Sequence, residues 1–282
     1  MIAICPNPFR DNNLDICRRI QNLLEGEGFE TAICPVFAEP GESDILPADL
    51  EYDSFSAVED KCSLALAIGG DGTLLTIVRN MKQHDIPVLG VNLGTKGFLA
   101  ELEPENVPLI VRAAKGDNDY SVRMMLDVEL IRNGEVVFQD CALNDVVMHG
   151  YGDCIRLNAW CDGDKVTSFS GDGIILATPT GSTGYSMSAG GPIVEPDAKN
   201  IIISPICAHM MSARSFVLDP ERTVSVIAEK LHGRRAYLSV DGNFVLDLDN
   251  GDIMKVKKSQ RYTRMVELGI NSFFEIAYKK LT

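Results

Sequence analysis

The segment from residue 64 to residue 91 constrains the fold of this chain more than any other. A short apolar run, LALAI (64–68), ends in GGDG (69–72), a helical pattern begins near Thr73, and a second apolar run, IPVLGV (86–91), follows. Strand, helix and strand at this spacing predict two parallel strands joined by a crossover helix. The N-terminal part of the chain is therefore expected to be an α/β layer.

An earlier unit of the same kind opens the chain. The apolar run IAIC (2–5) precedes apolar residues at helical spacing between Ile16 and Leu24, and Gly26 supplies a stop signal. The acidic stretch 38–60 is expected to be a surface connection or a ragged helix between the two units.

After a further helix near 104–115, turn signals between short alternating runs replace the helical pattern. The dipeptides Asn133-Gly134, Asp162-Gly163 and Asp241-Gly242 each follow such a run. Asn-Gly and Asp-Gly pairs favour two-residue hairpin turns because both positions adopt positive φ. An antiparallel β domain, either a sandwich or a pair of packed sheets, is therefore expected from about 120 to 260.

These patterns predict three parts of the chain. Residues 1–118 are expected to be an α/β domain that carries GGDGT, and residues 119–262 a β-rich domain. Residues 263–282 are expected to return to the N-terminal domain.

Composition and charge exclude several classes of function. The formal net charge of −14 would repel a phosphate backbone, so no nucleic-acid partner is expected, and it also argues against anionic membranes. The eight cysteines form no CxxC pair and the four histidines are isolated, so no metal site built from protein side chains is expected. With no apolar run of ~18 residues and no signal-peptide pattern, a cytoplasmic protein without membrane contact is expected.

One basic cluster departs from the acidic average. It consists of Lys255, Lys257, Lys258, Arg261 and Arg264. Such a cluster could attract phosphates, but it is more often the solvated face of an edge strand, where charge discourages aggregation between sheets.

The GGDGT run (69–73) carries the first chemical signal. Its glycines permit positive φ and leave no Cβ between a ligand and the backbone amides, and amides at a helix start favour anions. Asp71 at the tip would be placed to accept a proton from a hydroxyl. Taken alone, the motif fits either phosphate chemistry or a tight turn with a solvated Asp.

The run SGDGIILATPTGSTGYSMSAGG (170–191) carries the second signal. An apolar strand (174–177) leads into a loop dense in Gly, Ser and Thr and free of Lys and Arg. Hydroxyls and amides suit ribose hydroxyls and a metal-shielded diphosphate, and Tyr185 could pack against a planar ring. The alternative is a flexible hairpin loop.

A third signal lies in LNDVVMHG (143–150). Asn144 and Asp145 are expected to close a strand and could hydrogen-bond an adenine edge or a ribose hydroxyl. An Asn-Asp pair by itself is usually a turn or a cap.

In this order, GGDGT, the Asn-Asp pair and TPTGSTGYS (178–186) resemble the NAD kinase family, and the resemblance extends from the first strand to the C-terminal FFEIAYKKL (273–281). GGDGT is shared with phosphofructokinases and with diacylglycerol and sphingosine kinases, whereas TPTGSTGYS with an upstream GDG indicates NAD. The resemblance implies a Rossmann-like α/β N-terminal domain with a parallel sheet, of the phosphofructokinase and diacylglycerol kinase type. It also implies an antiparallel, β-sandwich-like C-terminal domain.

The resemblance further implies an activity. A kinase of this family uses Mg²⁺ or another divalent cation with ATP, or polyphosphate, to phosphorylate the 2′-hydroxyl of the adenosine ribose of NAD, giving NADP, and it assembles as a homodimer or homotetramer. Asp71 would be the catalytic base. The residues implied to line the dinucleotide site are Asp71, Gly72, Asn144, Asp145, Asp172, Thr183, Gly184, Tyr185, Ser186, Ser188 and Asn243.

Several positions depart from the family pattern, and some choices of function and substrate stay open. Gly184 stands where Ala is common, Asp145 where Glu is frequent, and Lys96 in GTKGF (94–98) where an apolar residue is usual. The alternative functions are a lipid kinase of the same superfamily and a non-catalytic sensor that binds NAD or NADP. The choices between ATP and polyphosphate and between NAD and NADH depend on loop geometry.

Overall fold

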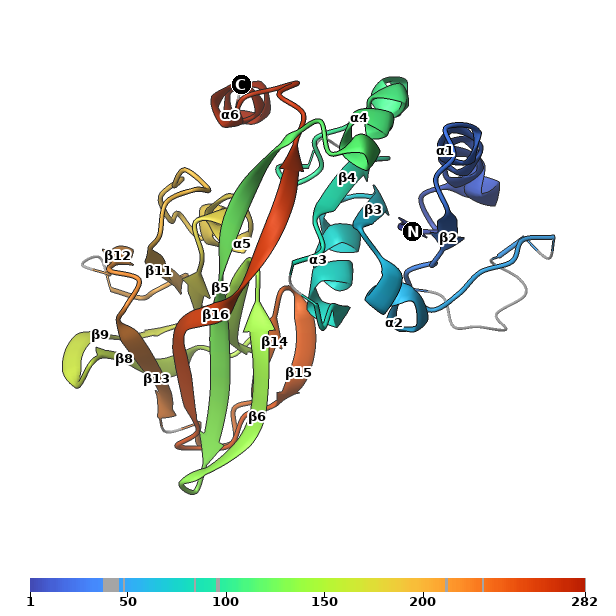
Figure 1. Ribbon diagram of the computed structural model, residues 1–282. Helices are drawn as coiled ribbons and strands as arrows, with labels where there is room; N and C mark the ends of the chain where they lie inside the picture. The colour runs from blue at the N-terminus through green and yellow to red at the C-terminus, as the bar shows by residue number, and fades with distance from the viewer. Residues whose placement is uncertain are drawn as a thin grey trace. The chain divides into compact units, whose positions relative to one another are not determined.

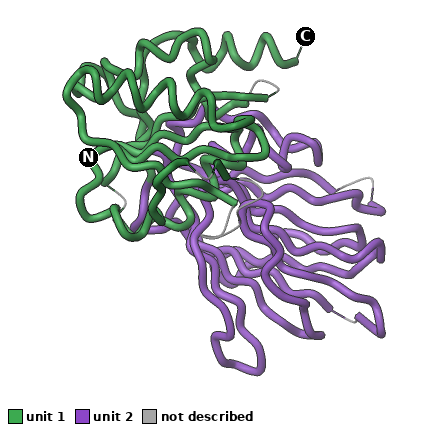
Figure 2. The backbone as a smooth tube through the Cα atoms, turned by 90° about the vertical axis from the view of Figure 1, so that its right-hand side faces the viewer, with its two compact units in different colours: residues 1–122, 263–282 green, residues 123–262 purple. Residues whose placement is uncertain are grey.

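The computed structural model describes most of the chain. The described ranges are 1–37, 46–47, 49–83, 85–94, 97–210, 213–229 and 231–281. They form two compact units, coloured separately in Figure 2: unit 1 is Met1–Val122 with Thr263–Thr282, and unit 2 is Arg123–Tyr262.

A parallel sheet forms the centre of unit 1 (Figure 1). Its strands, in spatial order, are β2 (Thr31–Ile33), β1 (Ile2–Pro6), β3 (Leu64–Gly69) and β4 (Val88–Asn92). Each neighbouring pair is parallel, which confirms the predicted α/β layer. Strands β1, β3 and β4 are buried throughout, and strands covered on both faces read as continuous apolar runs.

Helices connect these strands. The longer ones are α1 (Asp15–Gly26), which follows β1, and α3 (Asp71–Asn80), which joins β3 to β4. The shorter turns are η1 (Asn12–Leu14), α2 (Phe55–Val58), η2 (Glu59–Lys61), η3 (Pro104–Leu109) and α4 (Ile110–Lys115). Of the predicted connection 38–60, residues 38–45 and 48 lie outside the described residues.

Glu101 fastens the C-terminal segment to unit 1. Its two carboxylate oxygens each accept the amide of Leu268 at 2.9 Å, and one of them accepts the amide of Ile270 at 3.3 Å. Helix α6 (Phe273–Leu281) then begins with a reciprocal cap, in which Ser272 N–H donates to Glu275 Oε2 at 2.7 Å and Glu275 N–H donates to Ser272 Oγ at 3.2 Å. These two anchors fix where α6 starts.

Unit 2 consists of antiparallel strands in two packed sheets, as the turn signals predict. The first sheet runs β12 (Phe216–Leu218), β11 (Ile201–Ile206), β10 (Gly173–Ala177), β7 (Asp145–Gly150), β14 (Ala236–Val240) and β15 (Asn243–Asp247). The second contains β5 (Asp119–Arg132), β6 (Glu135–Ala142), β8 (Ile155–Cys161), β9 (Asp164–Gly171), β13 (Thr223–Glu229) and β16 (Ile253–Glu267). Fully buried side chains of both, such as Leu176 and Val226, form one core.

The three predicted hairpins are confirmed. Asn133-Gly134 joins β5 to β6, Asp162-Gly163 joins β8 to β9, and Asp241-Gly242 joins β14 to β15. Both residues of every pair have positive φ, from 47° to 95°. The local chemistry of each pair therefore fixes the register of the strands beside it.

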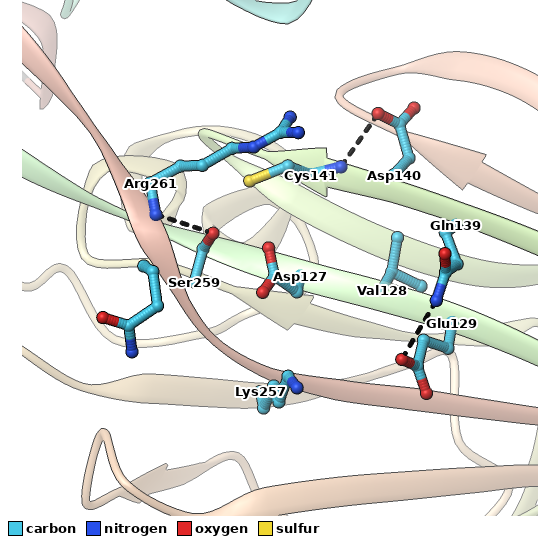
Figure 3. A pocket seen from close by; sticks show the side chains of 10 residues that line it. Asp127, Val128, Glu129, Gln139, Asp140, Cys141, Lys257, Ser259 and Arg261 are labelled. Atoms are coloured by element: carbon cyan, nitrogen blue, oxygen red, sulfur yellow. Dashed lines mark hydrogen bonds between the residues drawn. The ribbon is translucent and has the colours of Figure 1, made fainter. Parts of the chain in front are cut away.

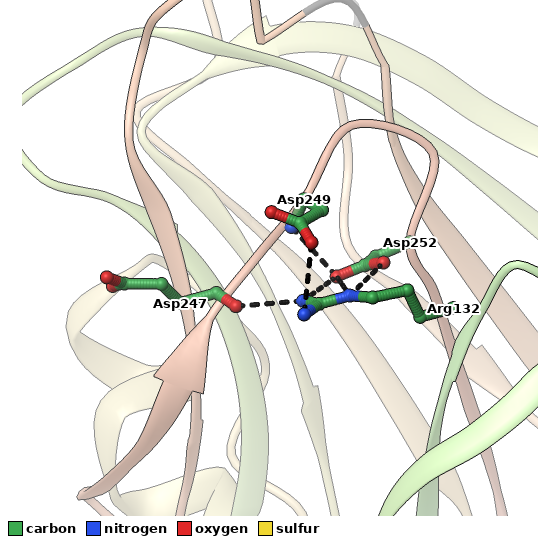
Figure 4. Close-up of polar contacts among 4 residues, drawn as sticks. All are labelled: Arg132, Asp247, Asp249 and Asp252. Carbon is green, nitrogen blue, oxygen red and sulfur yellow. Dashed lines mark hydrogen bonds and ion pairs between the residues drawn. The ribbon is translucent and has the colours of Figure 1, made fainter.

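Arg132, the last residue of β5, contacts three aspartates near the turn from β5 to β6 (Figure 4). Its guanidinium bonds Asp252 at 2.6 Å and Asp249 at 3.0 Å, and it donates to the carbonyl of Asp247 at 3.0 Å. The Asp252 side chain is only 2% exposed, so this carboxylate depends on the arginine for its charge balance.

The basic cluster lies on β16, and the expectation that it belongs to an edge strand is wrong. Strand β16 pairs with β13 on one side and also with β5. Met254 and Val256 enter the core, so Lys255 and Lys257, which alternate with them, lie on the other face of an interior strand. In the part of the chain that the structure describes, no helix has the length and apolar character of a membrane span.

Replacement of Glu101 by Ala should release the C-terminal segment, because the amides of Leu268 and Ile270 lose a charged acceptor. Hydrogen bonds to charged groups contribute about 1.5–3 kcal/mol, so local opening should become about tenfold more frequent or greater. Hydrogen exchange at these two amides is the measurement. Glu105→Ala, which removes an exposed carboxylate from η3, should leave both rates unchanged, and equal rates in the two variants would contradict the anchoring role.

Candidate active site

The GGDG turn lies where β3 ends and α3 begins. None of Gly69, Gly70 and Gly72 adopts the positive φ that glycine permits, and Gly70 is extended at φ −145°. The glycines are needed for space instead. A Cβ at Gly69 would strike the hydroxyl of Thr73, whereas Gly70 and Gly72 face open space and leave the first amides of α3 uncovered.

A neighbouring loop orients the carboxylate of Asp71. Phe98 N–H donates to its Oδ2 at 2.8 Å, and Leu99 N–H donates to its Oδ1 at 3.2 Å. Gly97 lies so close that a Cβ there would overlap the same carboxylate. Asp71 is therefore held in one orientation, with the remaining lone pairs of its oxygens available to a ligand.

A pocket of about 330 Å³ opens in front of this turn. Its lining comprises Asn7, Arg10, Phe37, Gly69, Gly70, Asp71, Gly72, Thr73, Asn92, Gly94, Gly97 and Lys280. The free amides at the start of α3 and two cations, Arg10 and Lys280, suit an anion there. Sequence reasoning missed both cations, because Arg10 lies in the turn after β1 and Lys280 in the last turn of α6, far from the motif along the chain.

Unit 2 holds a second group of predicted residues around Asn144 and Asp145. The expectation that this pair closes a strand is wrong, since Asp145 opens β7. The carboxylate of Asp241 accepts the amides of Leu143, Asn144 and Asp145 at 2.7 to 3.0 Å and so shapes the turn between β6 and β7. Asp241 had been recognised only as a hairpin residue, and its second role was not predicted.

Asp145 is a buried carboxyl group beside a second one. Burial, and to a smaller extent the negative charge of Asp241, raises the pKa of Asp145 to about 7. Next to it, Asn144 Oδ1 is buried and has no hydrogen-bond partner among the described residues. A buried unpaired acceptor is costly, and such atoms in native structures commonly mark a place that a ligand or water completes.

The Gly-, Ser- and Thr-rich run is ordered, so the flexible hairpin alternative is wrong. It forms two helical turns, η4 (Thr180–Thr183) and α5 (Tyr185–Ser188). Thr178 Oγ1 donates to the carbonyl of Leu143 at 2.6 Å, and a Cβ at Gly181 would strike the backbone of Asn144. The run is therefore packed directly onto the Asn144–Asp145 turn.

Aromatic rings continue this group. His149 stacks on Tyr185 at 6.4 Å between ring centroids and on Tyr237 at 5.6 Å. Burial chiefly raises the pKa of the Tyr185 phenol, and smaller contributions come, in decreasing order, from Tyr237, Cys207, Asp172 and Asp145. The ring of Tyr185 is still 41% exposed, so it is available to a planar ligand.

The remaining predicted residues differ in accessibility. Ser186 is fully buried and its hydroxyl bonds Ser204 at 2.8 Å, so it reaches no open surface. Thr183 is half-buried and donates to the carbonyl of Thr180, while Ser188 is exposed. Asn243 is exposed, and its amide donates to the carbonyl of Asp241 at 3.2 Å.

Gly184 lies beside Asn144 and Asp145. A Cβ there would stand 3.3 Å from the carbonyl oxygen of Gly181, 3.5 Å from Asn144 Nδ2 and 3.7 Å from Asp145 Oδ2. An alanine would therefore fit with a small shift. Lys96 lies outside the described residues.

A further pocket, of about 370 Å³, lies in unit 2 over β5, β6 and β16 (Figure 3). Lys257 and Arg261 of the basic cluster line it, but so do Asp127, Glu129 and Asp140. Burial raises the pKa of the Cys141 thiol there to about 12, so this thiol is a poor nucleophile. Mixed charge and an inert thiol give this pocket no evident chemistry. Across the described ranges, no three His, Cys, Asp or Glu side chains are grouped as metal ligands.

Comparison with known proteins covers nearly the whole chain. The family model of the ATP-NAD kinase N-terminal domain matches residues 7–115, and that of the ATP-NAD kinase C-terminal domain matches residues 143–268. A NAD kinase of Lachnoclostridium phytofermentans is 35% identical over 290 aligned positions, which span 99% of this chain and 97% of that protein.

The fold of this chain is also similar to that of solved structures. Yeast NADH kinase complexed with NADH superposes with a TM-score of 0.85 at 25% identity, covering 99% of this chain and 86% of that one. An NAD kinase from Archaeoglobus fulgidus in complex with ATP superposes with a TM-score of 0.75 at 26% identity, covering 98% of this chain and 99% of that one.

The raised pKa of Asp145 should make stability depend on pH. Between its ordinary pKa of 3.8 and about 7, the unfolded chain loses a proton that the folded chain keeps, so stability falls as pH rises through this window. Asp145→Asn removes the titrating group and therefore removes this fall in stability. The free energy of unfolding of the variant, relative to the parent, should rise by about 1.4 kcal/mol per pH unit across the window and then level off.

Urea unfolding from pH 4 to pH 8 measures this difference. Asp164→Asn, at an exposed position in β9, is the matched control and should run parallel to the parent at every pH. A parallel curve for Asp145→Asn as well would contradict the assigned shift.

Proposed function

This chain belongs to the NAD kinase family, and from that premise we propose that it transfers a phosphoryl group from ATP to the 2′-hydroxyl of the adenosine ribose of NAD, giving NADP and ADP. The observation that carries the proposal is the carboxylate of Asp71, oriented by two loop amides at the edge of a pocket that also holds helix amides and two cations. A base beside an anion pocket is what transfer from a nucleoside triphosphate to a hydroxyl requires.

The chemical step assigns a role to each group of unit 1. The ribose 2′-oxygen forms a bond to the γ-phosphorus, and its proton passes to Asp71. The bond from the γ-phosphorus to the bridging oxygen breaks, and ADP leaves with that electron pair. Phosphoryl transfer is catalysed mainly by positioning and charge stabilisation, so the amides of α3 and the cations of the pocket carry the rest.

Unit 2 is proposed to bind the dinucleotide. Asn144 Oδ1, buried without a partner among the described residues, would accept a hydrogen bond from an adenine or ribose donor, and Tyr185 would cover a planar ring. Asp145, Asp172, Gly184 and the other residues predicted for this site stay part of the proposal: Gly72, Thr183, Ser186, Ser188 and Asn243. Ser186 would act only by supporting α5, because its hydroxyl is occupied by Ser204.

A divalent cation fits this proposal as part of the donor. Mg²⁺ is usually held by one or two carboxylates together with substrate phosphates, and the pocket of unit 1 offers one carboxylate, Asp71, and the amide oxygen of Asn92. When bound, the cation would neutralise charge on the phosphate oxygens.

Three further parts of the proposal concern the whole protein. The domain limits 1–118, 119–262 and 263–282 are supported by compact units that change within a few residues of them. A cytoplasmic location is supported by eight free cysteines. Assembly as a homodimer or homotetramer is proposed from family resemblance alone.

Parallel assays separate this function from its alternatives. Initial rates with labelled ATP are compared for NAD, NADH and diacylglycerol, and polyphosphate replaces ATP in a second series. Transfer to a nicotinamide dinucleotide supports the proposal, transfer to the lipid alone overturns it, and binding of NAD without transfer indicates a sensor.

Asp71→Asn should bind NAD but phosphorylate it slowly, because the amide keeps the shape of the carboxylate and cannot take the proton. Removal of a general base costs about 10²–10⁴ in rate, so kcat should fall by that factor. One of the two loop hydrogen bonds is lost as well, which should lower stability by about 1 kcal/mol. Initial rates, NAD titrations and thermal unfolding give the three quantities.

Asp15→Asn is the matched control, since Asp15 also begins a helix, α1, but is exposed and lines no part of the pocket. It should keep the parent rate. If Asp71→Asn turns NAD over within a few-fold of the parent, Asp71 is not the base.

A further inference from the structure

Lys280 has an unusual setting for a lysine in a terminal helix. It lies in the last turn of α6, is half-buried, and its ammonium sits 4.1 Å from the ring centroid of Phe98. Its neighbour Lys279 is exposed and donates to Asn271 Oδ1 at 3.0 Å. Of these two lysines, only Lys280 lines the pocket of unit 1.

The ammonium of Lys280 has no counter-ion of its own in the part of the chain that the structure describes. Among the ion pairs and hydrogen bonds of the described residues, none involves this side chain. Burial lowers the pKa of Lys280, and the charge of Asp71 opposes that shift only in part. A partly desolvated cation without a partner is unfavourable unless an anion joins it.

Phe98 links this cation to the base. Its backbone amide donates to Asp71 Oδ2 at 2.8 Å, while its ring lies under the ammonium of Lys280. A cation over an aromatic face is attracted to the ring and is restrained in position. One residue therefore holds the carboxylate and the ammonium on the same side of the pocket.

The size and lining of the pocket indicate which kind of anion it binds. Its volume of about 330 Å³, the open amides of α3 and the guanidinium of Arg10 suit a polyphosphate better than a single carboxylate. The sequence contains no Walker A run, whose lysine usually binds the β- and γ-phosphates. A lysine is therefore needed from elsewhere if the donor's terminal phosphates are to meet a point charge.

We propose that Lys280 binds the terminal phosphates of the donor and, at the end of α6, fills the place that a Walker A lysine fills in other kinases. This inference rests on the proposed function, since it names a further residue of the same site. It also assigns a purpose to the return of the chain into unit 1, because the anchors at Glu101 and Ser272 set the position of Lys280.

Binding of inorganic tripolyphosphate, measured by calorimetry on the full chain without NAD, tests the inference apart from turnover. Lys280→Ala should weaken this binding by about 10–100-fold, the usual effect of a lost charge-assisted hydrogen bond. Lys279→Ala, the matched control, should bind as the parent does. Tripolyphosphate affinity within twofold of the parent in Lys280→Ala would overturn the inference.

Two more variants separate charge from packing. Lys280→Met keeps the length of the stem without the ammonium and should behave like the alanine variant, whereas Lys280→Arg should recover at least part of the affinity. Recovery with Met but not with Arg would show that the side chain only packs α6, and would also overturn the inference. Thermal unfolding of each variant confirms that it is folded.

Steady-state kinetics show whether the proposed kinase function can fail while the phosphate site at Lys280 is present. In an active enzyme, Lys280→Ala should raise the KM for ATP and leave NAD affinity unchanged. A parent that binds tripolyphosphate through Lys280 but phosphorylates no dinucleotide would support the phosphate site and refute the kinase.

Discussion

Two backbone amides hold the carboxylate of Asp71, and much of unit 1 is arranged around that contact. Strand β3 delivers Asp71 to the first turn of α3, and the loop after β4 supplies the amides of Phe98 and Leu99. Gly97 must be a glycine because the carboxylate occupies the space of a side chain. A charge fixed in this way needs no reorganisation when a substrate arrives, which is the main source of electrostatic catalysis.

In unit 2, too, backbone amides hold a carboxylate, but a second carboxyl group lies beside it. The carboxylate of Asp241 accepts three amides and shapes the turn that carries Asn144 and Asp145. No described residue donates such hydrogen bonds to the carboxyl group of Asp145, and burial beside Asp241 raises the pKa of Asp145 to about 7. The amide-bound carboxylate of Asp241 suits a structural anchor, and the buried carboxyl group of Asp145 suits a ligand donor or acceptor.

Local chemistry explains how much of the fold was predictable. The strand and helix spacing around GGDGT and the Asn-Gly and Asp-Gly pairs act over a few residues, and the parallel sheet and three hairpins follow from them. The errors concern longer-range pairing. Strand β16 is interior because β5 and β13 both pair with it, and Asn144 lies in the turn before β7 because the carboxylate of Asp241 accepts its amide. Lys280 was missed because a lysine in a terminal helix carries no local signal of a pocket.

Identification of the product tests the central claim most directly. The parent enzyme is incubated with ATP, Mg²⁺ and NAD, and the product is examined by ³¹P NMR. The account predicts one new phosphomonoester on the 2′-oxygen of the adenosine ribose, formed in equal amount with ADP. Phosphate released to water, a phosphomonoester on another hydroxyl, or ATP left unconsumed beside bound NAD would contradict it.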